Sequence, residues 1–244
     1  MEETLLQRLD RGEPCMVQVD MGYLTYFDFG GHVVVVCGYE PSTGMVLIAD
    51  RDRQLHPVSL AELAAARGSR YRRFPPGRRW WDFGFSGFRQ PREPEVLLAV
   101  QCQADLMQNP PIANIGVKGV RKAAAEVARW DSLLEPGELR VALFNVWIFV
   151  SATGGTGGGA FRRMFSRFLA EAADIARRPE QTAAGAGFRS IIDACDEIAI
   201  MACTASEERG AVRMASHLPA ISAALLDIAE REEAGWKELA RIVH

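Results

Sequence analysis

The sequence contains few of the residues on which metal centres and disulfide frameworks depend. Its 244 residues include four histidines and five cysteines, and no HxxxH, HExxH or CxxC spacing occurs. Zinc sites and disulfide-rich domains rely on such patterns, so we expect no metal, no cofactor and no disulfide framework. Scattered cysteines of this kind fit a reduced, cytoplasmic protein.

The sequence also has no large excess of positive or negative charge and no long apolar run. The net charge is −3, which gives no case for nucleic acid or an anionic membrane as a partner. The longest apolar run, near Val141 to Ala152, is interrupted by Asn145 and is too short to span a bilayer. The first residues, Met-Glu-Glu, contain no basic region, so we expect no signal peptide.

What remains is the composition of an ordinary globular protein, with 48% hydrophobic and 24% charged residues. The pattern changes from strands to helices after Gln90–Pro94, a segment rich in proline and charge. We therefore predict an α+β chain with a sheet-containing domain over residues 1–90 and an all-helical domain over residues 91–244.

Local patterns predict the individual elements. Ser59 and Glu62 form a capping-box pattern that opens a helix running to about Arg67. Strands are expected at 14–20 and 80–85 and a short helix at 2–10. In the second domain we expect helices at 96–108, 118–130, 138–152, 161–177, 188–205 and 212–242. The segment at 138–152 is expected to be a buried helix, with a strand as the alternative. The helix at 212–242 is expected to break near Pro219.

A β-hairpin around His32 is the most informative part of the first domain. The β-branched run Val33–Val36 predicts a buried strand, and Glu40–Gly44 has the proline and glycine of a turn before a second apolar run, Met45–Ala49. In an antiparallel hairpin the numbers of paired residues have a constant sum, here about 82 to 84. This sum places His32 opposite residues 50–52.

A histidine beside a carboxylate is the base and orienting group of a catalytic triad. We interpret His32 as a general base and Asp50 as the residue that orients it. Asp52 is the second choice for the orienting residue. The alternatives are a core histidine with satisfied hydrogen bonds and aspartates that cap turns. We assign no chemistry to His56, His217 and His244.

A nucleophile for this pair is not evident. There is no Gly-x-Ser-x-Gly elbow, and reactive thiols usually lie at a helix N-terminus. Cys15 and Cys37 fall in predicted strands, and Cys37, five residues after His32, is expected on the opposite face. The remaining cysteines, Cys102, Cys195 and Cys203, fall within predicted helices.

Two clusters near the hairpin each have two interpretations. The aromatic loop carrying Tyr23, Tyr26, Phe27 and Phe29 either packs on the sheet edge, which we favour, or forms a wall of a substrate cleft beside His32. An arginine-rich stretch is either a solvated loop, the favoured interpretation, or a dock for a phosphate-bearing acyl-carrier protein; its members are Arg67, Arg70, Arg72, Arg73, Arg78 and Arg79.

A glycine-rich stretch precedes the helix expected at 161–177. Residues 155–160 match GxGxxA, but the helices that follow exclude the βαβ unit of a dinucleotide site, and no Gly-Lys-Ser/Thr of a P-loop occurs. A flexible loop at a helix N-terminus could still bind a substrate or anion; the candidates are Gly157, Gly158, Gly159, Arg162 and Arg163. The alternative is a tight helix crossing that requires bare backbone.

These segments resemble a known family. Pro14–Asp50, with its Gly-His-Val-Val-Val-Val strand, Gly-Tyr turn and closing Ala-Asp, resembles the second half of a papain-like domain. It is similar to the peptidase domains of bacteriocin export transporters, and more closely to the N-terminal domain of the butirosin biosynthesis protein H family. Residues 109–119 and 156–164 resemble the helical domain of unknown function that follows it in that family.

The resemblance implies an acyltransferase of natural-product, aminoglycoside-type biosynthesis. An acyl group would pass from a carrier-protein thioester to an enzyme cysteine and then to a small-molecule amine, with His32 as base and Asp50 as its orienting group. The family's cysteine lies upstream of the strand that holds Cys15, so the nucleophile lobe is missing here. We therefore expect either an incomplete start or a non-catalytic binding subunit; a papain-like peptidase or thioesterase is a third possibility. Because that lobe is missing, one sheet face should be uncovered, and we expect a homodimer.

Overall fold

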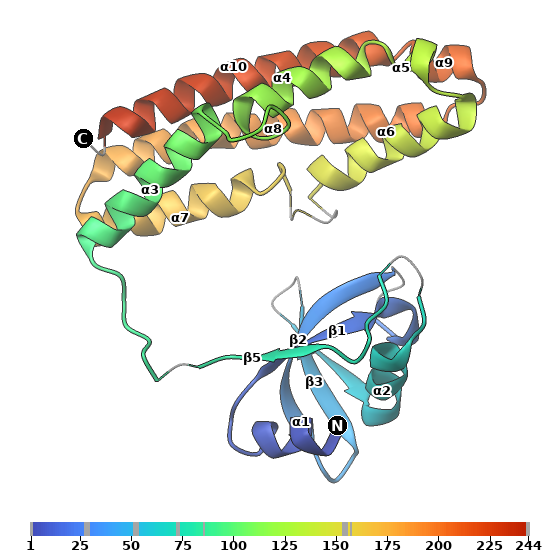
Figure 1. Cartoon of the computed structure of the whole chain (residues 1–244), viewed down its shortest axis with the longest axis vertical. Helices are drawn as coiled ribbons and strands as arrows, with labels where there is room; N and C mark the ends of the chain where they lie inside the picture. Colours follow the sequence, from blue (N-terminus) through green and yellow to red (C-terminus); the bar gives the residue numbers. More distant parts are fainter. Residues whose placement is uncertain are drawn as a thin grey trace. The chain divides into compact units, whose positions relative to one another are not determined.

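The computed structural model describes residues 2–26, 30–50, 54–71, 74–84, 86–152, 156 and 158–242. The chain is α+β and divides into two compact units, residues 1–89 and 90–244 (Figure 1). Several residues named above lie outside the described part of the chain: Phe27, Phe29, Asp52, Arg72, Arg73, Gly157 and His244.

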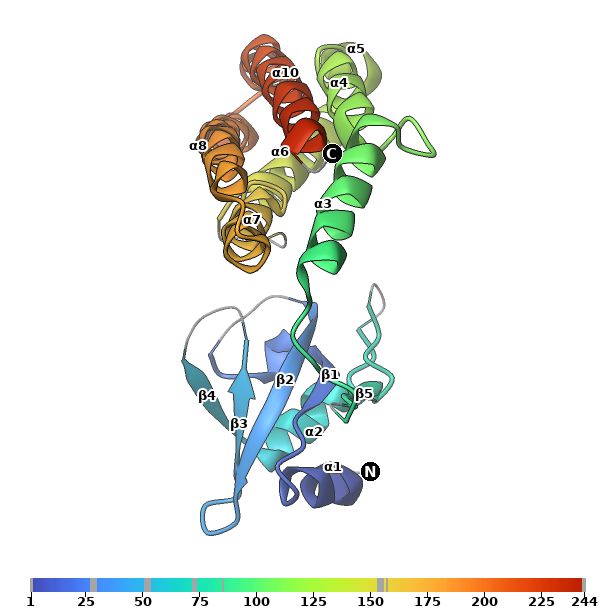
Figure 2. The same cartoon turned by 90° about the vertical axis from the view of Figure 1, so that its left-hand side faces the viewer.

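The first unit is built on an antiparallel sheet of five strands in the order β4-β3-β2-β1-β5 (Figure 2). The strands are β1 (Cys15–Asp20), β2 (Gly31–Glu40), β3 (Met45–Ala49), β4 (Leu55–Ser59) and β5 (Trp80–Asp82). The predicted strands are present, whereas β4 was not foreseen. Its sequence Leu-His-Pro-Val-Ser lacks an apolar run, and its Pro57 is tolerated because β4 is an edge strand.

One face of the sheet is the core of this unit. Strand pairing puts Val17 opposite Val34 and Val36 opposite Ile48, and all four side chains are buried. The helices α1 (Glu2–Leu9) and α2 (Leu60–Gly68) contribute buried apolar side chains to the same cluster, among them Leu5, Leu63 and Ala66. The apolar alternation of the strands therefore selects a single inner face, which both helices cover.

A β-bulge interrupts β2 at Cys37. Val36 pairs with Ile48 and Gly38 pairs with Leu47, so Cys37 is the extra residue. A bulge reverses the alternation that follows it. Tyr39 therefore packs on the inner-face cluster, although its odd number would place it with Val35 on the outer face.

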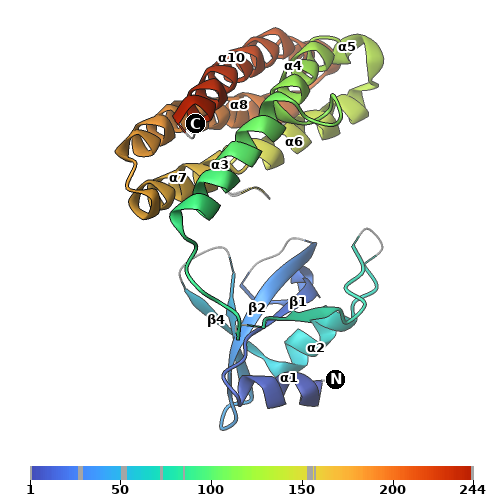
Figure 3. The same cartoon turned by 60° about the vertical axis from the view of Figure 1, so that its left-hand side comes forward.

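The second unit consists of α-helices packed around the long helix α8 (Pro179–Glu207), which contacts α6, α7 and α10 (Figure 3). Its buried residues, such as Phe188, Ile191 and Ile198, form the core. The other helices are α3 (Glu93–Gln108), α4 (Gly116–Val127), α5 (Trp130–Leu133), α6 (Pro136–Val150), α7 (Arg162–Ala176), α9 (Ala211–Ala215) and α10 (Leu218–Ile242).

Two predictions in this unit need correction. Helix α8 begins at Pro179 rather than at residue 188, because proline is favoured in the first turn and the Ala/Gly-rich stretch continues the helix. The segment at 136–150 is a helix, but only one of its faces is buried, since Val141 and Phe149 are 59% and 62% exposed. The predicted break of the last helix near Pro219 is confirmed, because α9 ends at Ala215 and α10 begins at Leu218.

No helix among the described residues combines the length and apolar character needed to cross a bilayer.

The capping box at the start of α2 provides a test of this fold. The Ser59 hydroxyl accepts a hydrogen bond from the Glu62 backbone N–H at 3.1 Å, and the Glu62 carboxylate accepts one from the Ser59 N–H at 2.7 Å. The Ser59 hydroxyl also donates to the Glu62 carboxylate at 2.7 Å, and this bond, followed by the one from the Ser59 backbone N–H, lowers the pKa of Glu62. We expect Ser59→Ala to lower the free energy of unfolding of the first unit by about 1 kcal/mol. Hydrogen exchange of the sheet amides measures this loss, and Ser86→Ala in an exposed turn is the control; equal stability of the two variants would contradict it.

Candidate functional site

His32 and Asp50 lie on the inner face of the sheet, at the end of the β2–β3 ladder. Near this end the paired numbers sum to 84, as in Val35 with Ala49, so continuing the ladder sets Asp50 opposite Val34. His32 is two residues before Val34 and points to the same face. The two side chains are therefore diagonal neighbours, and the Nε2 atom of His32 lies 2.8 Å from Oδ1 of Asp50. The predicted adjacency is confirmed, while the catalytic roles of the two residues stay a prediction.

The loop after β1 and the edge strand β4 complete this cluster. The Tyr26 hydroxyl donates a hydrogen bond to Oδ2 of Asp50 at 3.3 Å, and the Tyr26 ring stacks on His56 with centroids 4.1 Å apart. The Asp50 side chain is only 5% exposed, whereas that of His32 is 36% exposed. Asp50 is thus a buried acceptor for two donors, and His32 remains open to a reactant.

Sequence reasoning missed two members of this cluster. Packing was the favoured role for Tyr26, and His56 was given no role. Strand pairing explains the position of His56, which lies opposite Ile48 and therefore faces the same side as Asp50. Because β4 was not predicted from the sequence, this pairing could not be used to place His56.

The hydrogen-bond partners of His32 decide which of its nitrogens can act as a base. With Asp50 as an acceptor at Nε2, that nitrogen carries the proton and Nδ1 holds the lone pair. Among the described residues, Nδ1 of His32 has no hydrogen-bond partner. The arrangement can therefore take a proton at Nδ1 and stabilise the resulting imidazolium through Asp50.

The cysteines of the first unit do not lie at this nitrogen. Cys15 is on the inner face, but it is four residues along β1 from Val19, the partner of His32, which is about 13 Å. Burial raises the pKa of the Cys15 thiol. Cys37 lies at the bulge, is exposed, and donates its S–H to the Leu47 carbonyl at 3.4 Å.

The cysteines of the helical unit differ in exposure. Burial raises the pKa of Cys195 to about 12, so its thiol stays protonated at neutral pH. Burial, and then the Glu207 carboxylate, raise the pKa of Cys203. Cys102 is exposed on α3. None of these thiols begins a helix, where the helix dipole would activate it.

The arginine-rich stretch does not form a uniform basic surface. Arg67 is 1% exposed and donates a hydrogen bond to the Arg78 carbonyl, so it is part of the interior. An acyl-carrier dock would have to use the exposed members of the group, and that role stays a prediction.

The predicted glycine-rich segment brings a second cluster together in the helical unit. Arg162, in the first turn of α7, donates to the Glu232 carboxylate of α10 at 2.5 Å and to the Ala160 carbonyl at 2.5 Å. Glu232 is fully buried. Arg163 pairs with Asp196 of α8 at 3.3 Å. Each guanidinium group already has a carboxylate partner, so an anion would have to compete for it.

The described glycines of this segment lie at close backbone approaches. A Cβ atom on Gly158 would lie 3.2 Å from the Cα of Ala152, and one on Gly159 would lie 3.2 Å from Ile192. Both glycines have positive φ, at 96° and 59°. Both the limited space and the backbone conformation therefore require glycine here, as expected for a tight helix crossing. The anion-binding role stays a prediction.

Among the described residues, no group of three or more histidine, cysteine, aspartate or glutamate side chains is arranged to bind a metal ion.

Comparison with known families accounts for most of the chain. A family model described as "Domain of unknown function (DUF4872)" matches residues 61–239. The chain belongs to this family. A second model, "Butirosin biosynthesis protein H, N-terminal", matches residues 1–51, a segment that contains both His32 and Asp50. A search of curated proteins gave no match.

The family boundary does not coincide with the boundary between the structural units. The matched domain of unknown function starts at residue 61, inside α2, and includes β5. Yet α2 packs on the sheet, and β5 pairs with β1. The domain of unknown function therefore includes part of the fold that holds His32.

The two arginine–carboxylate pairs offer a matched stability test. We expect Glu232→Gln to cost about 3–5 kcal/mol, because it leaves the Arg162 cation, whose side chain is 17% exposed, without its counter-charge. We expect Asp196→Asn to cost less than about 1 kcal/mol, since both side chains of that pair are about 40% exposed. Urea denaturation followed by circular dichroism measures both; similar losses would show that the buried pair is no more important than the exposed one.

Proposed function

We propose that the protein acts in natural-product biosynthesis of the aminoglycoside type, transferring an acyl group from a carrier-protein thioester to a small-molecule amine. The observation that carries the proposal is the 2.8 Å contact between His32 and Asp50 within the segment that matches the N-terminal part of butirosin biosynthesis protein H. A base with one nitrogen oriented and the other open is what a papain-like acyl transfer requires.

The two half-reactions use His32 in turn as base and acid. Nδ1 of His32 takes the proton of a cysteine thiol, the thiolate attacks the thioester carbonyl, and the imidazolium returns the proton to the departing carrier thiol. The amine then attacks the acyl-enzyme, and its proton passes through His32 to the released cysteine. Asp50 keeps the ring in place and stabilises its cationic form.

The thiol is the group that the described part of the sheet unit does not place beside Nδ1, because Cys15 and Cys37 lie elsewhere on the sheet. This observation favours a second candidate function, that of a non-catalytic binding or assembly subunit. A papain-like peptidase or thioesterase would use the same residues with water as the acceptor.

One assay separates these functions. The protein, expressed together with any in-frame extension upstream of Met1, is incubated with an acyl-carrier-protein thioester and an aminoglycoside amine, and the products and the intact protein are weighed by mass spectrometry. We expect an amide product and a covalent acyl adduct on the wild-type protein. His32→Ala and Asp50→Asn should each lower kcat/KM by about 10²–10⁴, because the base or its orientation is lost.

His217→Ala is the matched control, since His217 lies in the helical unit, and it should retain full activity. Release of free acid instead of amide would identify a hydrolase. The absence of both product and adduct would refute acyl transfer and leave the binding subunit.

We also propose a homodimer formed through the outer face of the sheet. Val35 and Leu47 are half-buried there and Cys37 is exposed, in contrast to the buried Val34, Val36 and Ile48 of the inner face. We expect light scattering to give a dimer at micromolar concentration and Val35→Lys to give a monomer, because it places a charge on this apolar face. Thr43→Lys in the exposed β2–β3 turn should remain dimeric. A wild-type monomer would disprove the proposal.

A further inference from the structure

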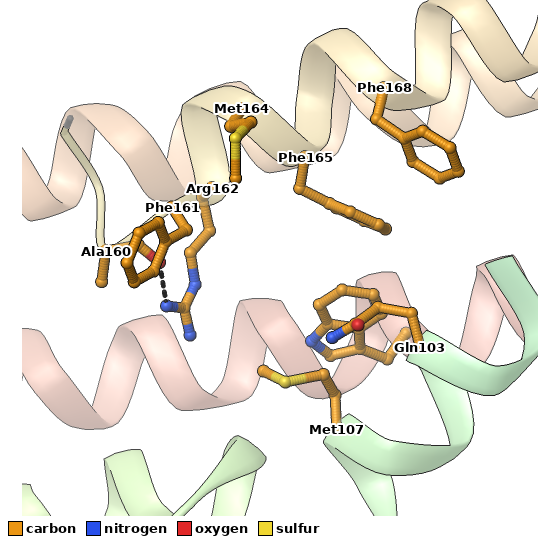
Figure 4. A pocket seen from close by; sticks show the side chains of 9 residues that line it. Gln103, Met107, Ala160, Phe161, Arg162, Met164, Phe165 and Phe168 are labelled. Carbon is orange, nitrogen blue, oxygen red and sulfur yellow. Dashed lines mark hydrogen bonds between the residues drawn. The ribbon is translucent and has the colours of Figure 1, made fainter. Parts of the chain in front are cut away.

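A pocket of about 510 Å³ opens between α3, α7 and α10 of the helical unit. Figure 4 shows Gln103 and Met107 reaching in from α3, facing Phe165 and Phe168 of α7 across the space. Its remaining lining residues are Ala160, Phe161, Arg162, Met164 and Trp236. The volume falls in the range of sites for small organic molecules.

The walls of this pocket are aromatic. Phe165 packs against Trp236 with ring centroids 4.8 Å apart, and Trp236 is only 2% exposed, so these rings form a fixed inner surface. At the entrance, Phe161 and Met164 are 54% and 65% exposed. Flat rings backed by adaptable methionines suit a planar apolar molecule.

The pocket also contains a buried donor. Among the described residues, the indole N–H of Trp236 has no hydrogen-bond partner, although its nitrogen is inaccessible to water. An unpaired buried N–H is costly, and a ligand with an acceptor atom would remove that cost. The Gln103 amide, half-buried in the same wall, offers a second donor.

The charges near the pocket are already balanced. Arg162 is the charged residue that lines it, and its guanidinium is paired with the buried Glu232. A charged ligand would have to break this pair or enter without a counter-ion. The site therefore favours an uncharged ligand.

Backbone strain is concentrated at the same place. Ala160 and Phe161 both have positive φ, at 46° and 71°, a conformation that side-chain-bearing residues rarely adopt. Two such residues in succession put the exposed Phe161 ring at the pocket entrance. Strain retained where a side chain is presented to a cavity is typical of ligand sites.

We propose that this pocket binds an uncharged aromatic small molecule that directs a hydrogen-bond acceptor at the indole N–H of Trp236. This site is separate from the cluster around His32 and does not depend on the acyl-transfer chemistry proposed for that cluster. Under this proposal, the helical domain recognises a planar, neutral compound.

The test uses two probes of nearly identical shape. In 2-acetylnaphthalene a carbonyl oxygen is the acceptor, and in 2-isopropenylnaphthalene a methylene group replaces that oxygen. By titration calorimetry on the full chain, we expect saturable binding at one site, with 2-acetylnaphthalene about 3- to 10-fold tighter, as for one neutral hydrogen bond. Trp236→Phe should remove this difference between the probes, because it keeps a ring and deletes the donor.

A second pair of variants keeps the proposal testable if Trp236→Phe fails to fold. Phe161→Ala removes an exposed ring at the entrance and should weaken both probes by roughly 3- to 10-fold. Phe149→Ala removes a similarly exposed ring of α6 that does not line the pocket, and should change neither affinity. The proposal is overturned if the wild-type chain binds neither probe, if the probes bind equally, or if the two phenylalanine variants behave alike.

Discussion

The antiparallel pairing of β2 with β1 on one side and β3 on the other determines where His32 and Asp50 lie. A strand has a period of two, so a slip of one residue would move His32 to the outer face and separate it from Asp50. The buried valines at 17, 34 and 36 prevent this slip, because exposing them would cost about 1.5–3 kcal/mol each. The bulge at Cys37 comes after these residues, toward the turn, and leaves the end that holds His32 in register.

The helical unit combines an apolar core with a buried ion pair. Helix α8 is surrounded by α6, α7 and α10, and the pair formed by Arg162 and Glu232 links α7 to α10 through charge, in addition to the apolar contact between Phe165 and Trp236. Glycine is needed beside this pair because the backbone is crowded there. The same local arrangement balances the charge and presents Phe161 at the pocket entrance, so the structural and ligand-binding interpretations of the glycine-rich segment are compatible.

Sequence reasoning succeeded where the determining contacts are local. The β2–β3 hairpin and the Ser59–Glu62 cap each depend on residues close in the chain, and both were predicted together with the adjacency of His32 and Asp50. The contact of Tyr26 with Asp50 was not predicted, because it depends on the path of a loop. Likewise, Glu232 is 70 residues from Arg162, and no local pattern in the sequence indicates that the two residues form a pair.

The last strand of the sheet has a mechanical consequence. β5 is held by three residue pairs with β1, and Arg8 of α1 secures it through an ion pair with Asp82 at 2.7 Å and a position over the Trp80 ring. Residues 83–92 then lead into the helical unit. Any pulling force between the two units must pass through this short ladder before it reaches the longer β1–β2 pairing. Because β5 pairs with β1 through fewer residues than β2 does, we expect β5 to separate first under load, while β1 and β2 stay paired.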